Sequence, residues 1–230
     1  MRQEIKTQLT TLQRFLDKDF FIALLSYLTL TLLFAFLSKL LANFKILVKL
    51  DLTIQNEVVM LRSDSIVDIL KYFTDFGDTK AMIAWTILAA AILFWKKHYI
   101  YSMGIALTIG VTELIAFIIK NSIGRHRPPE FMALVSESSP SFPSGHTIAA
   151  VSFYGFLMYF FYKKIQNKIL RNFLMMICSL IILLAGFTRI YLGAHWPSDT
   201  FASYAISGTW LSIIIVLIER HLKKYPDSQV

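Results

Sequence analysis

Cysteine is nearly absent from this chain, and acidic side chains are fewer than basic ones. Cys178 is the one cysteine among 230 residues, so an intrachain disulfide is excluded and nothing follows about the redox compartment. Only 15 aspartate and glutamate residues stand against 23 lysine and arginine residues. The basic residues cluster in short loops and tails, without a basic stripe interleaved with aromatic residues. This distribution argues against a nucleic-acid partner and is typical of membrane-protein loops.

Long apolar segments dominate the rest of the sequence. Hydrophobic residues make up 56% of the chain, and the mean hydropathy is +0.57. A helix needs about 20 apolar residues to cross the ~30 Å hydrocarbon core of a bilayer. Six such segments are predicted, over residues of about 20–42, 79–95, 99–119, 146–162, 170–188 and 199–218. The predicted fold is therefore all-α, a six-transmembrane-helix bundle in which residues 1–230 form one membrane-embedded domain.

Residues 43–78 differ from the six apolar segments because six acidic residues lie among their apolar positions. Burying so many charges in a bilayer is unfavourable. This segment is predicted to form one or two helices that lie at the membrane interface, between spans one and two. It either shapes a lipid entrance or merely connects the spans, and the sequence leaves both open.

The distribution of lysine and arginine predicts the orientation of the bundle. Six spans place both termini on the same side as the turns at 96–97 and 163–171. That side holds 13 of the 23 basic residues. Because cytoplasmic loops carry an excess of basic residues, both termini are predicted to be cytoplasmic, in a multi-pass protein of the cell membrane.

Three polar motifs lie at the ends of apolar segments, all on the predicted extracytoplasmic side. They are Lys120 with Arg127-Pro128, then Pro143-Ser144-Gly145-His146, then Thr188-Arg189 with His195 and Asp199. Lysine and arginine keep their charge, and the arginine fork matches a phosphate group with two hydrogen bonds. We interpret the three motifs as one phosphate site. Lys120 taken alone is equally typical of an interfacial anchor at the end of a span.

The second motif opens a predicted helix. The first turn of a helix has unpaired N–H groups and a partial positive charge, which favour an anion. Gly145 allows close approach of the backbone, and Ser144 adds a hydroxyl donor. Ser144 is also expected to cap the helix, which leaves His146 unexplained.

In the third motif His195 and Asp199 are four residues apart, with Pro197 suited to the first turn of a helix. This spacing can place the carboxylate against one imidazole nitrogen. Such a pair fixes the tautomer and raises the basicity of the other nitrogen, as a nucleophilic or basic histidine requires. Alternatively, Asp199 only favours the positive end of its helix, and both roles can hold together.

The order and spacing of these motifs resemble the phosphatidic acid phosphatase type 2 superfamily of membrane lipid phosphatases, which is related to vanadium haloperoxidases and bacterial acid phosphatases. The family pattern is Lys-x6-Arg-Pro, Pro-Ser-Gly-His and Ser-Arg-x5-His-x3-Asp, and this chain departs from it only at Thr188. The resemblance implies that His195 attacks phosphorus to form a phosphohistidine, that Asp199 orients it, and that His146 protonates the leaving oxygen. It also implies that the phosphoryl oxygens are bound by Lys120, Arg127, Ser144, Gly145 and Arg189.

The expected function is hydrolysis of a phosphate monoester or diphosphate of a lipid. Phosphatidylglycerophosphate, phosphatidate and polyprenyl diphosphate all fit, because they present nearly the same phosphoryl group. No metal-ligand pattern is present, so the activity is predicted to be independent of metal and of any cofactor. The expected partners are a lipid phosphate and the bilayer, and the oligomeric state cannot be read.

Three alternatives remain open. A lipid phosphotransferase has the same site, a haem protein would use His146 and His195 as ligands, and a transporter has interrupted spans. Glu113 lies inside a span, seven residues before Lys120, and is expected to pair structurally below the site or to relay protons. His126 has no predicted role.

Overall fold

A computed structural model describes residue 10 and residues 13–41, 45–76 and 78–225. Every helix bound given below refers to these residues. All regular elements among them are helical, which confirms the predicted all-α class.

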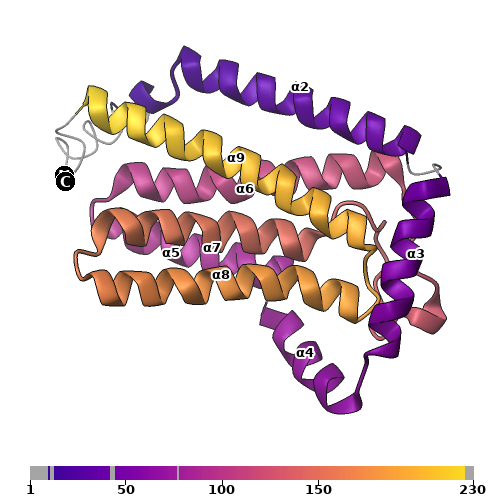
Figure 1. The fold of residues 1–230 in the computed structure, drawn as a ribbon. Helices are drawn as coiled ribbons and strands as arrows, with labels where there is room; N and C mark the ends of the chain where they lie inside the picture. The colour runs from indigo at the N-terminus through magenta and orange to yellow at the C-terminus, as the bar shows by residue number, and fades with distance from the viewer. Residues whose placement is uncertain (1–9, 11–12, 42–44, 77, 226–230) are drawn as a thin grey trace.

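Six long helices run along one another (Figure 1). They are α2 (Lys18–Leu41), α5 (Thr79–Trp95), α6 (Tyr99–Ile123), α7 (Gly145–Lys164), α8 (Lys168–Tyr191) and α9 (Pro197–Lys224). A helix therefore occupies each of the six predicted ranges, although residue 42 at the end of the first range lies outside the described residues. Several helices extend beyond the prediction by up to one or two turns, as helices do when their polar ends leave the apolar layer.

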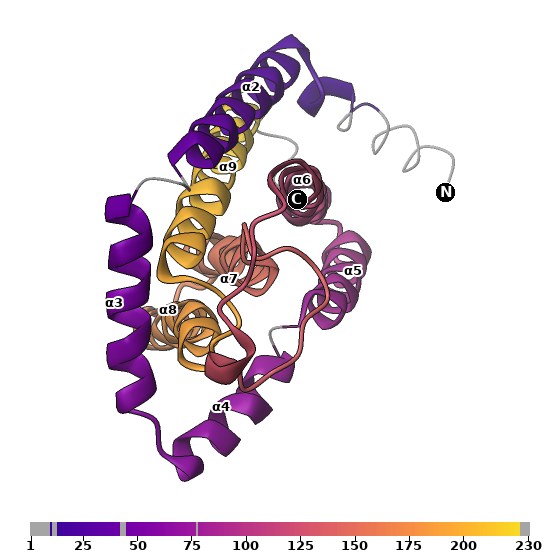
Figure 2. The same cartoon turned by 90° about the vertical axis from the view of Figure 1, so that its right-hand side faces the viewer.

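Helix α7 lies at the centre of the bundle, surrounded by α5, α6, α8 and α9 (Figure 2). Its small residues Ala149 and Ala150 are fully buried, which lets the neighbouring helices approach closely. The core between α6, α7 and α9 contains Phe156 and Trp210, and the Trp210 ring stacks on Tyr27 of α2 at 4.8 Å between centroids. This packing gives the helix ends that carry the motifs a rigid support.

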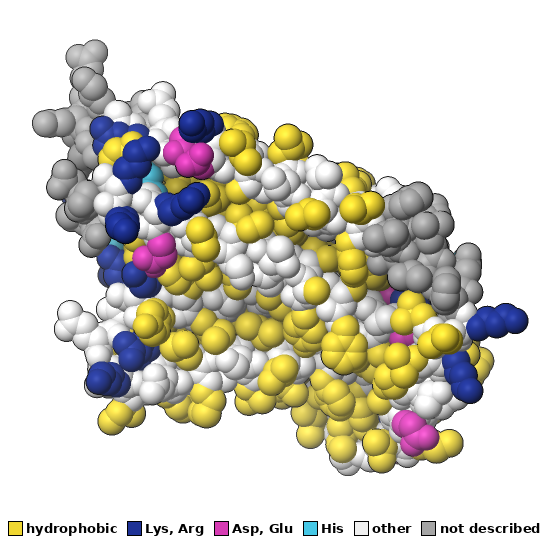
Figure 3. Space-filling model, turned by 45° about the horizontal axis from the view of Figure 1, so that its top comes forward, with side chains coloured by type: hydrophobic (Ala, Val, Ile, Leu, Met, Phe, Trp, Pro, Cys, Tyr) yellow, Lys and Arg dark blue, Asp and Glu magenta, His cyan; other side chains and the backbone are white. Residues whose placement is uncertain are grey.

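The outer surface of the bundle is suited to a lipid environment. Figure 3 shows hydrophobic side chains across the middle of the molecule, and lysine and arginine side chains gathered at the end where α9 terminates. Of the helices in the described ranges, α6, α8 and α9 are long and apolar enough to cross a membrane, and α5 is a shorter apolar helix. The fold is thus that of a multi-pass membrane protein, while six crossings remain a prediction.

The segment between spans one and two forms two helices, α3 (Lys45–Met60) and α4 (Asp64–Phe76). Both cross one end of the bundle instead of running along it (Figures 1 and 2). Asp51 and Gln55 of α3 are buried against α9 and α8, where Asp51 accepts from the Ser198 N–H at 3.0 Å and Gln55 Nε2 donates to the Ile190 carbonyl at 3.0 Å. The segment is therefore more than a connection between spans.

The same end of the bundle collects four helix termini. Helices α6 and α8 end there, and α7 and α9 begin there, whereas α9 ends at the opposite end (Figure 1). The loop between α6 and α7, which includes the short 3-10 helix η1 (Glu130–Met132), folds over these termini. All three sequence motifs therefore meet at one end of the fold.

Candidate active site

His195 lies in the turn between α8 and α9 and is 1% exposed. The turn is possible because Gly193 has a φ of +69°, where a side chain is disfavoured, and a Cβ there would collide with the backbone carbonyl of Met132. The Leu134 N–H donates to the Leu192 carbonyl at 2.8 Å and joins the turn to the α6–α7 loop. Close packing of backbone on backbone holds the imidazole in place.

The hydrogen bonds around His195 define its tautomer. Arg127 Nη1 lies 3.2 Å from His195 Nε2. A guanidinium group can only donate, so Nε2 accepts and carries the lone pair. The proton of the neutral ring is then on Nδ1, which faces Asp199 Oδ2 at 3.7 Å. That distance is too long for a hydrogen bond, and the pair interacts as charge with dipole.

Asp199 is fully buried, and its oxygens accept hydrogen bonds from other groups. Arg125 donates to Oδ1 and the Ser141 hydroxyl donates to Oδ2. The Trp196 N–H, at the start of α9, donates to Oδ2 at 3.1 Å. Asp199 therefore closes the first turn of α9 and also faces the imidazole, and its predicted role in orienting His195 stays a prediction.

Burial and nearby positive charge keep His195 neutral. Burial, above all, lowers the pKa of His195 to about 4, the cations Arg127 and Arg189 act in the same direction, and the Asp199 carboxylate opposes them. The imidazole is therefore unprotonated at neutral pH, with its lone pair on the nitrogen that faces Arg127. This is the state that a nucleophilic histidine requires.

Arg127 is held by the loop that precedes α7. Its Nε donates to the Ser139 carbonyl at 2.7 Å, and Nη1 donates to the Ala194 carbonyl at 2.6 Å. These bonds fix the planar fork beside His195. Lys120, at the end of α6, donates to the Pro140 carbonyl at 3.0 Å and to the Ser139 hydroxyl at 3.2 Å, so both cations converge on one loop.

Arg189, near the end of α8, is 1% exposed. Its Nη1 donates to the Thr74 hydroxyl of α4 at 2.9 Å, and its Nη2 donates to the Glu137 carboxylate. The second oxygen of Glu137 lies 3.9 Å from Arg127 Nη2. One carboxylate therefore lies between the two arginines that the motifs assign to phosphate, and sequence reasoning did not single it out.

The Pro-Ser-Gly-His motif opens α7 as predicted, with Ser144 in the N-cap position and Gly145 as the first helical residue. The Ser144 side chain, however, caps no backbone N–H. It accepts a hydrogen bond from the Thr147 hydroxyl at 3.0 Å, while the Ser144 N–H donates to the Ser203 hydroxyl at 2.8 Å. The bond to Ser203 joins the start of α7 to α9.

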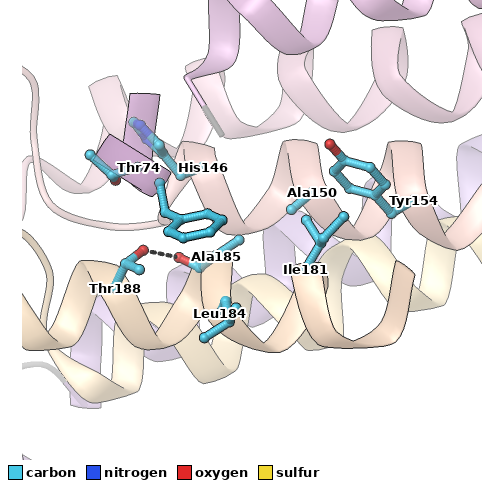
Figure 4. Close-up of a pocket in the computed structure, with 9 residues that line it drawn as sticks. Thr74, His146, Ala150, Tyr154, Ile181, Leu184, Ala185 and Thr188 are labelled. Carbon is cyan, nitrogen blue, oxygen red and sulfur yellow. Dashed lines mark hydrogen bonds between the residues drawn. The ribbon is translucent and has the colours of Figure 1, made fainter. Parts of the chain in front are cut away.

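His146 borders an apolar cavity, and its imidazole lies at the same end of that cavity as Thr74 (Figure 4). Because Thr74 accepts from Arg189, His146 lies near Arg189, one of the cations predicted to bind phosphate. Within the described ranges, Glu113 forms no hydrogen bond with Lys120. Its Oε1 is buried and accepts no hydrogen bond among the described residues, and Lys120 donates to the loop instead of to Glu113.

Sequence reasoning missed a second ion-pair network behind Asp199. Arg125 Nη2 donates to Asp51 Oδ2 at 2.6 Å, while its Nη1 bridges to Asp199 and to the Ser198 hydroxyl, the latter at 2.8 Å. Asp51 also accepts from the Ser198 N–H at 3.0 Å. Helix α3 thus supports the first turn of α9. The only signal in the sequence was the position of Arg125 inside the first motif.

The site has the ligands of an anion and not those of a metal ion. Among the described side chains, no group of three or more His, Cys, Asp or Glu residues is placed to hold a metal. Independence of the activity from metal ions stays a prediction. Buried cations beside two histidines, at one end of apolar helices, define the class of a membrane enzyme that acts on phosphate groups.

Comparison with known proteins gives the same class. Residues 100–223 match the model of the PAP2 superfamily, which is more than half of the chain, and the protein belongs to that family. The expected resemblance is therefore confirmed, and a membrane phosphatase agrees better with it than a haem protein or a transporter. Phosphatases of this family are hydrolases that act on lipid phosphates.

Individual relatives act on different lipids. The chain is 26% identical to phosphatidylglycerophosphatase B of Bacillus subtilis, across 76% of this chain and 86% of the relative. It is 25% identical to an undecaprenyl-diphosphatase of Sulfolobus acidocaldarius, across 59% of this chain and 63% of that relative. The crystal structure of a transmembrane PAP2-type phosphatidylglycerolphosphate phosphatase from Bacillus subtilis superposes with a TM-score of 0.71 at 25% identity, covering 86% of this chain and 96% of that one.

Proposed function

We propose that this protein hydrolyses a phosphate monoester or diphosphate of a membrane lipid, through a phosphohistidine formed on His195. One observation carries the proposal. The Glu137 carboxylate lies between Arg127 and Arg189, and Arg127 also contacts His195 Nε2. A carboxylate therefore already pairs with the guanidinium group that contacts Nε2, the nitrogen proposed to attack. A phosphoryl group that displaces Glu137 gains the same donors with a larger negative charge.

In the first step, the Nε2 lone pair of His195 attacks phosphorus, and the bond from phosphorus to the lipid-side oxygen breaks. His146 gives its proton to that oxygen as it leaves. The negative charge of the phosphoryl group favours the protonated form of His146 before the step. Arg127, Arg189 and Lys120 stabilise the phosphoryl oxygens, and Asp199 stabilises the positive charge that develops on the His195 ring.

In the second step, water attacks the phosphohistidine. His146, now neutral, accepts a proton from this water, the bond from phosphorus to nitrogen breaks, and orthophosphate is released. This step returns His146 to its protonated form and His195 to its neutral form, which are the states from which the cycle starts. No metal takes part in this scheme. The reaction is predicted to occur at the extracytoplasmic face of the membrane.

Phosphate release from a panel of lipids tests the proposal. The panel contains phosphatidylglycerophosphate, phosphatidate and a polyprenyl diphosphate in detergent with EDTA. We expect His195→Ala and His146→Ala to lower kcat/KM by at least ~10³-fold. His126→Ala is the matched control, because this exposed histidine contributes only its backbone carbonyl, to Trp196 Nε1 at 2.9 Å, and the variant should keep full activity.

A quenched reaction with labelled substrate tests the intermediate. Acid-labile label should remain on the wild-type protein and be absent from His195→Ala. Full activity of both the His195 and His146 variants would contradict the mechanism, while complete dependence on added Mg²⁺ would contradict only its metal independence. Label transferred to an acceptor other than water would identify a phosphotransferase instead.

A further inference from the structure

An apolar cavity of about 180 Å³ opens beside the phosphate site, between α4, α7 and α8. Its wall includes Thr74 of α4, His146, Ala150 and Tyr154 of α7, and Ile181 and Ala185 of α8. Figure 4 shows Thr74 and His146 at one end of the cavity, Tyr154 at the other, and Ala150 and Ile181 between them. The cavity therefore has one end at Thr74 and His146, an apolar middle, and a far end at Tyr154.

The end at Thr74 and His146 is continuous with the phosphate site. Thr74 accepts a hydrogen bond from Arg189 at 2.9 Å, and His146 is the proposed proton donor to the leaving oxygen. Any group attached to that oxygen must therefore start at this end. Since the leaving oxygen joins the phosphoryl group to the rest of the lipid, the cavity lies where the first atoms of the lipid go.

The wall of the cavity has few groups that could bind polar atoms. The Thr74 hydroxyl accepts from Arg189, and the Thr188 hydroxyl donates to the Ala185 carbonyl at 3.1 Å. Between His146 and the Tyr154 hydroxyl at the far end, the wall consists of hydrocarbon. A glycerol unit would bring ester or hydroxyl oxygens into this wall, and burying them without partners is unfavourable.

We propose that the cavity binds a hydrocarbon chain joined directly to the leaving oxygen, so that the preferred substrate is a prenyl-type monophosphate. A glycerophospholipid would bring ester or hydroxyl oxygens into this wall, and a prenyl diphosphate would bring its second phosphate. This inference rests on the proposed function and selects among its candidate lipids. The volume corresponds to about six water molecules at ~30 Å³ each, enough for the first carbon atoms of one chain. The rest of the chain lies against the exposed apolar side chains of α8, such as Leu180 and Leu183.

Two substitutions change the cavity in opposite directions. Ala185→Phe fills its middle, and Tyr154→Ala opens its far end. Ala205→Phe is the matched control, since Ala205 is an exposed alanine of α9 that lines different surface hollows. All three variants keep the cations and both histidines of the phosphate site.

The test compares kcat/KM for farnesyl phosphate, farnesyl diphosphate, phosphatidate and phosphatidylglycerophosphate. We expect kcat/KM of the wild type for farnesyl phosphate to exceed the values for farnesyl diphosphate and both glycerophospholipids by at least ~10-fold. Ala185→Phe should lower kcat/KM for farnesyl phosphate by a similar factor, the range typical of a changed apolar pocket. Ala205→Phe should not change kcat/KM for farnesyl phosphate. The inhibition constant of orthophosphate should stay within about twofold in every variant, because the phosphate site is unaltered.

Tyr154→Ala keeps the test decisive if Ala185→Phe does not fold. It should raise kcat/KM for geranylgeranyl phosphate relative to farnesyl phosphate. A wild type that prefers farnesyl diphosphate or a glycerophospholipid, or equal losses in Ala185→Phe and Ala205→Phe, would overturn the inference and leave the proposed function standing. A wild type that releases phosphate from none of the lipids would overturn the proposed function itself.

Discussion

The two ends of the bundle carry similar numbers of cationic groups in contrasting environments. At the site end, Arg189 and Arg125 have side chains that are 2% and 13% exposed, and each forms an ion pair with a carboxylate. At the opposite end, Lys163 pairs with Glu219 at 2.8 Å, and the two side chains are 32% and 43% exposed. Charge alone therefore does not distinguish a catalytic end from one that faces water.

The difference lies in how completely each charge has lost its water. Removing an arginine from water is unfavourable unless fixed acceptors replace the lost hydrogen bonds. The site end supplies such acceptors from α3, α4 and the α6–α7 loop, whereas Lys163 keeps contact with solvent. A buried cation with fixed acceptors is already oriented for an anion, so its removal should affect catalysis. It should also lower stability, because the carboxylate that it pairs with loses its partner.

Two separate variants, Arg189→Gln and Lys163→Gln, test this contrast between a buried and an exposed cation, and this pair has the largest expected difference in kcat/KM between the two ends of the bundle. We expect Arg189→Gln to lower kcat/KM by ~10²–10³-fold, the usual cost of losing one donor to transition-state charge. Lys163→Gln should leave kcat/KM within about twofold, because an exposed ion pair contributes only ~0–1 kcal/mol to stability. Steady-state phosphate release measures both. Equal losses of kcat/KM in the two variants would show that the burial of Arg189 is unrelated to activity.

Arg125→Gln sharpens the comparison within the site end. Arg125 contacts Asp199 and Asp51 and is proposed to position Asp199 without touching the substrate. We expect kcat to fall by up to ~10²-fold, because a small displacement of a catalytic group can lower the rate by that factor. KM should change little. Arg125→Lys should restore part of the loss. A rise in KM with unchanged kcat would show instead that Arg125 binds the substrate.

The pH dependence of kcat/KM reports the buried state of His195. Its pKa is lowered to about 4, and the attacking form is neutral, so activity should hold as pH falls from 7 to 5 and decline as pH passes through 4. Arg127→Gln removes a positive charge that lowers this pKa, so in the residual activity the decline should begin at higher pH. An acid limb at the ordinary histidine pKa in the wild type would contradict the burial of His195.

Glu137→Gln should have the smallest effect, and in the direction of tighter binding. The carboxylate between Arg127 and Arg189 competes with a phosphate for the same donors. Without its charge, we expect the inhibition constant of orthophosphate to fall by about fivefold, which corresponds to ~1 kcal/mol. Ser136→Ala, one residue earlier in the same loop, is the control. Weaker inhibition by orthophosphate in Glu137→Gln would show that Glu137 holds the arginines in place instead of competing for them.

The helices and the three motifs could be predicted from the sequence because both are local patterns. A long apolar segment indicates a helix from the local sequence alone. His195 and Asp199 are likewise close in sequence, only four residues apart. The partners of the cations could not be predicted. Asp51 and Arg125 are 74 positions apart, and Arg189 and Thr74 are 115 apart, so these pairs depend on how α3 and α4 cross the bundle.

Ser144 illustrates the same limit on a smaller scale. Its position before α7 follows from the sequence, but its hydroxyl bonds with Thr147 and its N–H with Ser203, instead of capping the helix. The neighbouring helix α9 supplies an acceptor that local sequence cannot reveal. The predicted location was right, and the predicted hydrogen bond was wrong.

The turn between α8 and α9 holds three of the candidate site residues on one helical hairpin. The N–H groups of Ala194 and His195 donate to the Arg189 carbonyl at 2.9 and 3.1 Å, so Arg189, His195 and Asp199 are carried on one hairpin of helices. Lys120 and Arg127 arrive on a separate arm of the chain. That segment is nevertheless tied to the hairpin, because Arg127 donates to the Ala194 carbonyl at 2.6 Å and the Leu134 N–H donates to the Leu192 carbonyl at 2.8 Å. A substitution that disturbs the turn should therefore displace residues from all three motifs at once.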